Sequence, residues 1–176
     1  MQHMILKRSI FLLLIFFNIS HGVYAFDENI SRPSELPEME ELNQLLYGSN
    51  KIEGIVFTIY ESDESSLTDI MPRLLYYVSL IKKKFNDLPV AVVSHGDEML
   101  ALTTENIDYY PEVHSNLKKV VNLFDVYFHV CGSFARLNDL EIHDFPDYVD
   151  VVPFGPSQID DYQSIGYKTI DLEVEY

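Results

Sequence analysis

The sequence has a single cysteine, Cys131, and this residue is the strongest candidate for a reactive group. Cys131 ends an apolar run, residues 126–131, and Gly132 and Ser133 follow it directly. This pattern is typical of a buried strand that passes into a helix. Backbone N–H groups at the start of a helix stabilise a thiolate, which is the reactive form of cysteine. The competing interpretation is that Cys131 is a small buried hydrophobic residue, as most unpaired cysteines are.

Two histidines could assist such a thiol. His129 lies two residues before Cys131, so alternation along a strand puts both on the same face of the sheet. His95 follows another apolar run and could lie across the sheet from the thiol. Because buried polar groups normally have hydrogen-bond partners, a core histidine is the favoured interpretation of His129, and a catalytic base is the alternative. For His95 the two interpretations weigh equally.

The first residues resemble a targeting segment. Residues 1–25 have a basic start, an apolar stretch at residues 10–17 and a small residue, Ala25, at their end. These features predict a secretory signal peptide that is cleaved near Ala25 and Phe26, and hence a periplasmic or secreted protein. An uncleaved N-terminal anchor is the alternative. A lone cysteine in an oxidising compartment cannot form an internal disulfide.

The size and charge of the chain limit the classes of protein it could belong to. The chain has 176 residues, with 12 basic and 28 acidic side chains and a formal net charge of −16. We therefore expect one domain, at residues 51–176, and no nucleic-acid partner. No segment after the signal is long and apolar enough to span a membrane, so we expect no stable membrane insertion after signal cleavage.

An acidic leader at residues 26–50 precedes this domain and contains one short helical pattern. Pro37 can begin the helix and Gly48 can end it. The apolar side of the helix comprises Met39, Leu42, Leu45 and Leu46. We expect this leader to pack as an arm on the domain or on a neighbouring subunit.

From residue 51 onward, apolar strands alternate with amphipathic helices. The predicted strands are residues 55–60, 89–93, 126–131, 149–152 and 167–172. The predicted helices are residues 66–84, 98–102, 112–123, 133–140 and 157–165. In the first of these helices Ser66 can serve as the N-cap, with Asp69 three residues later. Strands separated by helices predict a three-layer α/β fold: a mainly parallel five-stranded sheet with helices on both faces, as in flavodoxin-like proteins.

In open parallel sheets, ligands bind beyond the carboxyl ends of the strands. The residues that follow the predicted strands should therefore share one edge and form a binding site there. Besides the cysteine and the two histidines, the predicted binding residues are Tyr60, Ser94, Gly96, Gly132, Ser133, Phe154 and Gly155.

Several familiar motifs do not occur in this sequence. It has no phosphate-binding P-loop, no G-x-G-x-x-G fingerprint and no G-x-S-x-G nucleophile elbow. Nucleotide-dependent enzymes and serine hydrolases are therefore disfavoured. His143, Asp144 and Asp147 are close in sequence, but their spacing fits no dedicated metal site. We expect no cofactor and no metal.

Three short motifs, in this order, resemble the DsrE/DsrF-like family in its exported, largely uncharacterised branch. They are Val-Val-Ser-His-Gly at residues 92–96, Val-Cys-Gly-Ser at residues 130–133, and the Gly-Tyr pair at residues 166–167. The resemblance spans roughly residues 52–172. It implies a DsrE-like fold, a homo-oligomer, and a persulfide carried on Cys131.

Two hypotheses of function follow. The first is an exported sulfur carrier or sulfurtransferase that uses a persulfide on Cys131, assisted by His95 or His129, with a small sulfur compound or another thiol as partner. The alternative is a non-catalytic small-molecule-binding or oligomeric assembly module with a structural cysteine. Aromatic residues near the predicted edge motivate the second hypothesis: Tyr60, Tyr109, Tyr110, Phe134 and Phe154.

Overall fold

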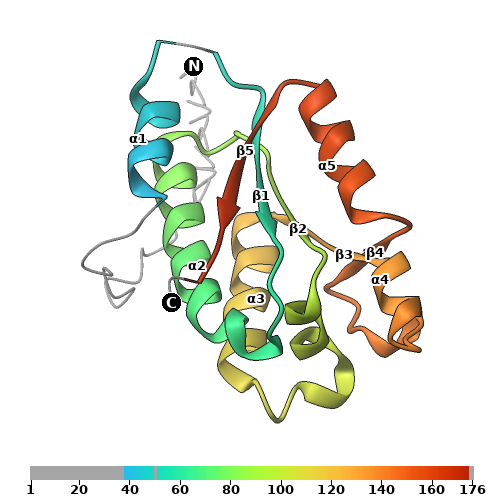
Figure 1. Cartoon of the computed structure of the whole chain (residues 1–176). Coiled ribbons are helices and arrows are strands. Elements are labelled where there is room, and N and C mark those ends of the chain that lie inside the picture. Colours follow the sequence, from blue (N-terminus) through green and yellow to red (C-terminus); the bar gives the residue numbers. More distant parts are fainter. Residues whose placement is uncertain (1–37, 50, 175–176) are drawn as a thin grey trace, which may run out of the picture.

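A computed structural model describes residues 38–49 and 51–174 of the chain. The fold is built on a parallel sheet (Figure 1). Its five strands are ordered β4-β3-β2-β1-β5, and every neighbouring pair is parallel. They are β1 (Gly54–Ile59), β2 (Val90–Ser94), β3 (Tyr127–Cys131), β4 (Asp150–Val152) and β5 (Tyr167–Leu172). The predicted five-stranded, mainly parallel α/β fold is therefore confirmed.

The strand order follows from the path of the chain. The chain steps outward from β1 through β2 and β3 to β4, and then returns to place β5 on the other side of β1. In register, Ile55 of β1 lies opposite Val90 of β2, and Val92 of β2 lies opposite Phe128 of β3. Because β1 and β2 have a strand on each side and helices above and below, all their residues are buried, and their sequences are mostly apolar.

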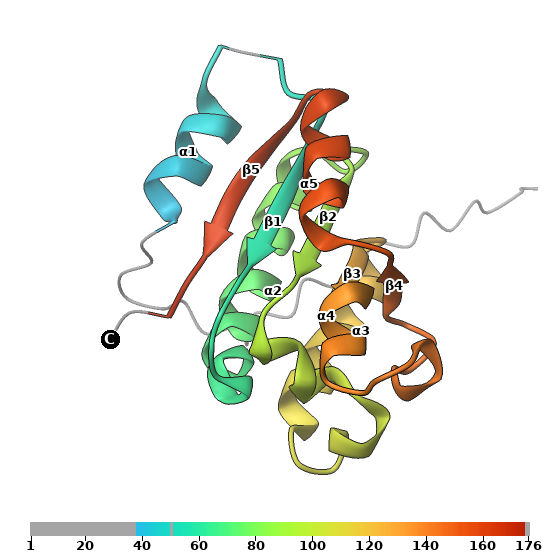
Figure 2. The ribbon, with the colours of Figure 1, turned by 45° about the vertical axis from the view of Figure 1, so that its right-hand side comes forward.

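The helices complete the other two layers. The helices α1 (Met39–Tyr47), α2 (Leu67–Lys84) and α3 (Pro111–Phe124) lie on one face of the sheet, and α5 (Gly155–Ser164) lies on the other (Figure 2). The helix α4 (Gly132–Leu137) follows β3 without a loop. Short 3-10 helices occupy the connections: η1 (Glu64–Ser66), η2 (Asp97–Leu102), η3 (Thr104–Asn106) and η4 (Ile142–Asp144).

The two faces of the sheet bury very different cores. The large core lies under α1, α2 and α3, and it includes the apolar stripe of α2: Ile70, Leu74, Leu75, Val78 and Ile81. The opposite core is small, with Val56, Ala91 and Val93 packed against Ile159 and Tyr162 of α5. Since burial of apolar surface drives packing, α5 is held by fewer apolar contacts than the helices on the opposite face.

Several helix boundaries differ from the prediction by one to three residues, and two of these differences have a clear local cause. The side chain of Ser66 makes no capping hydrogen bond, because η1 precedes α2 and Ser66 already has helical dihedral angles. The carboxylate of Asp63 instead accepts the N–H of Ser65 at 2.8 Å. The helix after β3 ends at Leu137, because Asp139 has the left-handed φ of 56° and the chain cannot continue as a helix.

The start of α1 is tied to α2 and to the end of the chain. Arg73 donates to the buried carboxylate of Glu38 at 2.9 and 3.2 Å, and Tyr77 donates to the same carboxylate at 2.6 Å. Arg73 also donates to the carbonyl of Glu173 at 2.5 Å. Burial and the bond to Glu38 raise the pKa of Tyr77 well above its usual value. These bonds pack the leader helix onto the domain.

Part of the sequence analysis falls on residues that the structure does not describe. The predicted signal at residues 1–25 lies outside the described residues, and so does Pro37. Of the helices that the structure does describe, none combines the length and the apolar character needed to cross a membrane.

Candidate functional site

The carboxyl ends of the parallel strands meet at one edge of the sheet, where four chain segments follow β1, β2, β3 and β4 (Figure 1). Cys131 is the last residue of β3 and the N-cap of α4. Cys131 is 2% exposed, and its thiol is not part of a disulfide. Its sulfur accepts the backbone N–H of Gly155 at 3.2 Å and lies 3.1 Å from the hydroxyl oxygen of Ser133. The thiol is thus buried and hydrogen-bonded.

These contacts change the acidity of the thiol. Burial raises the pKa of Cys131, but hydrogen bonds from the Ser133 hydroxyl and from the backbone N–H groups of Gly155, Phe134 and Ser133 lower it. The hydrogen bonds outweigh burial, so the pKa of Cys131 lies below its usual value. Since N–H and O–H donors favour the charged form of an acceptor, the site stabilises the thiolate.

Glycine at position 155 allows α5 to reach the thiol. A Cβ atom there would lie 2.9 Å from the Cβ of His95 and 3.2 Å from the Cβ of Cys131. Gly132 is equally confined, since its Cβ would lie 2.8 Å from the carbonyl oxygen of Val152. Gly155 therefore lets the start of α5 approach Cys131, and Gly132 lets the start of α4 pack against β4.

The Cβ atoms of His95 and Cys131 both border Gly155, and the two residues directly follow Ser94 and Val130, which are paired between β2 and β3. The half-buried ring of His95 stacks on Tyr60, with ring centroids 4.9 Å apart and an interplanar angle of 24°. Burial lowers the pKa of His95, so its ring favours the neutral form. Within the described residues no hydrogen bond joins His95 to Cys131. His95 is therefore adjacent to the thiol site through Gly155.

His129 shares a face of β3 with Cys131, but its ring is bound elsewhere. Its Nδ1 lies 2.8 Å from the carboxylate of Asp150 in β4, and its Nε2 lies 2.8 Å from the hydroxyl of Tyr162 in α5. Burial lowers the pKa of His129, although the bond to Asp150 opposes this shift. Since both ring nitrogens have partners, this histidine joins β3, β4 and α5, and neither nitrogen faces the thiol.

The sequence analysis missed Glu98, which is fully buried in η2. One carboxylate oxygen accepts the hydroxyl of Ser94 at 2.7 Å and the backbone N–H groups of His95 and Gly96 at 3.0 and 3.1 Å. The other oxygen accepts the backbone N–H of Glu61 at 2.8 Å. Burial raises the pKa of Glu98, and its hydrogen bonds oppose the shift. An acidic residue directly before the apolar residues 99–102 was the available signal.

The other predicted binding residues divide between these two clusters and an exposed rim. Ser94 and Gly96 belong to the Glu98 cluster, and Gly132, Ser133 and Gly155 surround Cys131. Tyr60 and Phe154 are 69% and 51% exposed.

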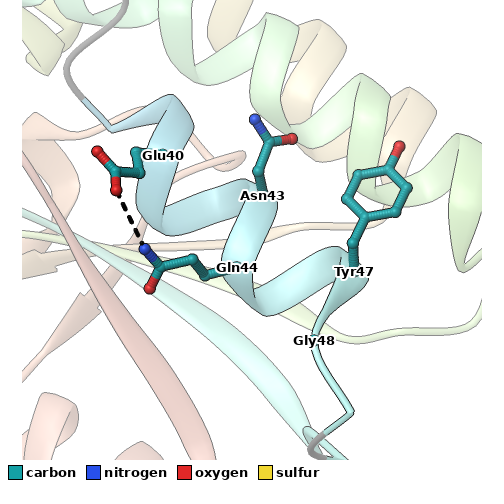
Figure 3. Close-up of a pocket in the computed structure, with 5 residues that line it drawn as sticks. All are labelled: Glu40, Asn43, Gln44, Tyr47 and Gly48. Atoms are coloured by element: carbon teal, nitrogen blue, oxygen red, sulfur yellow. Dashed lines mark hydrogen bonds between the residues drawn. The ribbon is translucent and has the colours of Figure 1, made fainter.

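A surface hollow occurs elsewhere, on the outer side of α1 (Figure 3). Its lining comes from one helix and its end: Glu40, Asn43, Gln44, Tyr47 and Gly48. These residues are exposed, and the one hydrogen bond drawn among them runs from Gln44 to Glu40 at 3.3 Å. The hollow contains no nucleophile and does not belong to the carboxyl edge. Among the described residues, no group of three His, Cys, Asp or Glu side chains could hold a metal ion.

Comparisons with known proteins support the fold. No protein-family model and no curated protein matches the chain. The structure of a protein of unknown function, MTH1491 from Methanobacterium thermoautotrophicum, aligns with a TM-score of 0.53 and 24% identity over 67% of this chain and 97% of that chain. The ychN protein from E. coli aligns with a TM-score of 0.49 and 12% identity over 69% of this chain and 100% of that one. The likeness to MTH1491 shows that the chain has a DsrE-like type of fold.

Proposed function

We propose that this protein is an exported sulfur carrier that holds sulfane sulfur as a persulfide on Cys131. The observation that carries the proposal is the environment of the sulfur. Gly155 at the start of α5 donates its N–H to the sulfur, the Ser133 hydroxyl lies within hydrogen-bond distance, and the pKa of the thiol is lowered. A thiolate is the form that attacks a sulfur–sulfur bond.

The chemistry of loading is a displacement at sulfur. The Cys131 thiolate attacks the terminal sulfur of a polysulfide or the outer sulfur of thiosulfate. A new S–S bond forms, the S–S bond of the donor breaks, and the electron pair leaves with the shortened polysulfide or with sulfite. Unloading is the same exchange in reverse order: an acceptor thiolate attacks the outer sulfur of the persulfide, and Cys131 leaves as the thiolate. No redox cofactor is needed in either step.

Burial of Cys131 limits which donors can reach it. Cys131 is 2% exposed, so either the sulfur donor must be a small molecule, or the start of α5 must move away from the sulfur. The small core under α5 favours the second route, because few apolar contacts hold this helix. We expect thiosulfate and polysulfide to react faster than bulky disulfides.

The proposal includes the cell compartment and the assembly. Residues 1–25 support export to the periplasm or the medium, and the resemblance to DsrE-like proteins supports a homo-oligomer. N-terminal sequencing of the protein recovered from the periplasmic fraction tests the first point. Light scattering of the purified protein tests the second, and a monomer at all concentrations would contradict it.

The test of sulfur carriage is an intact-mass measurement after incubation with polysulfide or thiosulfate. One added sulfur atom should raise the mass by about 32 Da, because a thiolate accepts sulfane sulfur at neutral pH. The shift should vanish with reductant and should be absent in Cys131→Ser. A mass shift that persists in Cys131→Ser would show that the sulfur is elsewhere and would contradict the proposal.

One observation favours the alternative, a binding or assembly module with a structural cysteine. Cys131 belongs to the large apolar core, while Tyr60 and Phe154 present exposed aromatic surface at the same edge. Under this alternative Cys131→Ala keeps both assembly and function, and the thiol is alkylated only after unfolding. Rapid alkylation of the native protein would exclude it.

A further inference from the structure

The carboxylate of Glu98 organises the turns that follow β1 and β2. It is fully buried and accepts four donors, three from the segment at residues 94–96 and one from Glu61 after β1. Two further backbone bonds hold the turns together: His95 donates to the carbonyl of Ile59 at 3.1 Å, and Asp97 donates to the carbonyl of Glu61 at 2.8 Å. The position of the His95 backbone is therefore set by Glu98 and by the end of β1.

Gly96 shows how closely the turns enclose the carboxylate. A Cβ atom at this position would lie 2.4 Å from the carbonyl oxygen of Glu61 and 2.5 Å from Oε2 of Glu98. Because only glycine leaves this space, the amide groups can wrap around the carboxylate. The carboxylate supplies the several lone pairs that four donors require.

A continuous set of contacts leads from this carboxylate to the thiol. Glu98 fixes the backbone of His95, and the Cβ of His95 borders Gly155. Gly155 in turn donates its N–H to the sulfur of Cys131. The ring of His95 is held on its other side by Tyr60. A shift of the His95 backbone would therefore be transmitted to the N–H group that stabilises the thiolate.

We propose that Glu98 is a positioning residue for the thiol site: through His95 it holds Gly155 against Cys131 and keeps the N–H of Gly155 on the sulfur. The inference rests on the proposed function only in taking Cys131 as the reacting group. The hydrogen-bond partners of Glu98 are backbone and side-chain groups of this chain.

The test is the ionisation of Cys131 in Glu98→Gln, followed through the ¹³Cβ signal of selectively labelled cysteine against pH. The chain has one cysteine, so the signal is unambiguous and needs no reagent to reach the buried sulfur. Glutamine keeps the shape of the side chain, but its NH₂ group cannot accept, so either the N–H of Glu61 or the N–H groups of His95 and Gly96 lose this acceptor, depending on which way the amide faces. The matched control is Glu105→Gln, which removes a charge from an exposed glutamate in η3.

The expected result is a rise of the Cys131 pKa by about half a unit to one unit in Glu98→Gln, because the thiolate loses part of a hydrogen bond. The NOE between the His95 and Tyr60 rings should weaken in parallel, and Glu105→Gln should match the wild type. The sign of the shift is decisive, because simple removal of a nearby negative charge would lower the thiol pKa. An unchanged or lowered pKa in folded Glu98→Gln would overturn the proposal.

A second variant serves if Glu98→Gln does not fold. Ser94→Ala removes one donor to Glu98 at 2.7 Å and leaves the backbone donors in place. It should produce a smaller rise of the Cys131 pKa in the same direction, and no rise would overturn the proposal. Failure of wild-type protein to form a persulfide would reject the sulfur-carrier function, whereas the pKa shift would still establish the positioning role of Glu98.

Discussion

Two acceptors at the same sheet edge are held in different ways. The carboxylate of Glu98 is fully buried and receives four donors from the turns after β1 and β2, which lie in the middle of the sheet. The sulfur of Cys131 has side-chain and backbone donors from the starts of α4 and α5, including Ser133 and Gly155. The first cluster joins segments that the large core already fixes. The second depends on α5, which packs on the smaller core.

This difference assigns different roles to the two clusters. A buried carboxylate with every donor in place is rigid, since loss of any one bond leaves an unsatisfied buried group. We expect the thiol site to open more readily, through movement of the start of α5, because fewer apolar contacts hold this helix. We infer that the Glu98 cluster is the fixed half of the edge and that the Cys131 cluster is the half that can change during a reaction.

The largest expected effect is that of Glu98→Ala on stability. The substitution removes an acceptor from four donors, of which the N–H of His95 keeps the carbonyl of Ile59, and it opens a cavity, so the free energy of unfolding should fall by more than about 3 kcal/mol. Urea denaturation followed by circular dichroism measures it. Glu105→Ala is the control and should stay within about 0.5 kcal/mol of the wild type. A loss of less than 1 kcal/mol, on the order of an ordinary surface change, would show that the Glu98 cluster is not rigid.

The second-largest expected effect on stability is that of Gly155→Ala, which acts on the Cys131 cluster. The new methyl group would lie 2.9 Å from the Cβ of His95, so the start of α5 must move away from the sulfur. We expect a loss of about 1–3 kcal/mol in the free energy of unfolding and a rise in the Cys131 pKa. The two measurements are urea denaturation and the ¹³Cβ titration. Ser157→Ala, at an exposed position of α5, is the matched control. An unchanged thiol pKa would mean that the N–H of Gly155 does not stabilise the thiolate.

The two clusters also differ in how far sequence reasoning could reach them. The strands and the apolar stripe of α2 could be predicted because their periodicity is local: each residue is judged against neighbours a few positions away. Cys131, Gly132 and Ser133 could be placed together for the same reason. Glu98 could not, because its role depends on Glu61, which follows β1 and is far from Glu98 in the sequence.

The same limit explains the interpretation of His129. Alternation along β3 correctly puts His129 and Cys131 on one face, as the partners in α5 and β4 show. The hydrogen-bond partners of His129 are Asp150 and Tyr162, and the placement of the elements that carry them depends on the strand order. Periodicity does not specify strand order, so the direction of the ring could not be read from the sequence.

A smaller effect concerns the pH dependence of stability. Burial lowers the pKa of His129 in the folded protein, so the unfolded chain binds the proton at higher pH. Stability is therefore fully present above the unfolded pKa of about 6.5 and decreases as pH falls below it. His129→Gln removes this contribution, and the loss of unfolding free energy between about pH 7 and pH 5 should become smaller. Burial also lowers the pKa values of His95 and His114, so these two histidines still make the stability of the variant depend on pH. Urea denaturation at a series of pH values measures it, and a slope identical to the wild type would contradict the assignment.

The smallest expected effect on stability is that of Ser133→Ala, which removes the hydroxyl group beside the thiol. Removing the hydroxyl 3.1 Å from the sulfur should raise the Cys131 pKa by less than about one unit, because the N–H groups of Gly155, Phe134 and Ser133 remain. Stability should hardly change, since Ser133 lies on the partly exposed first turn of α4. The ¹³Cβ titration measures the pKa, with Ser157→Ala as control. Among the groups that lower the pKa of Cys131, the Ser133 hydroxyl has the largest effect and the N–H of Gly155 the next largest, so an unchanged thiol pKa in Ser133→Ala would contradict this description of the thiolate site.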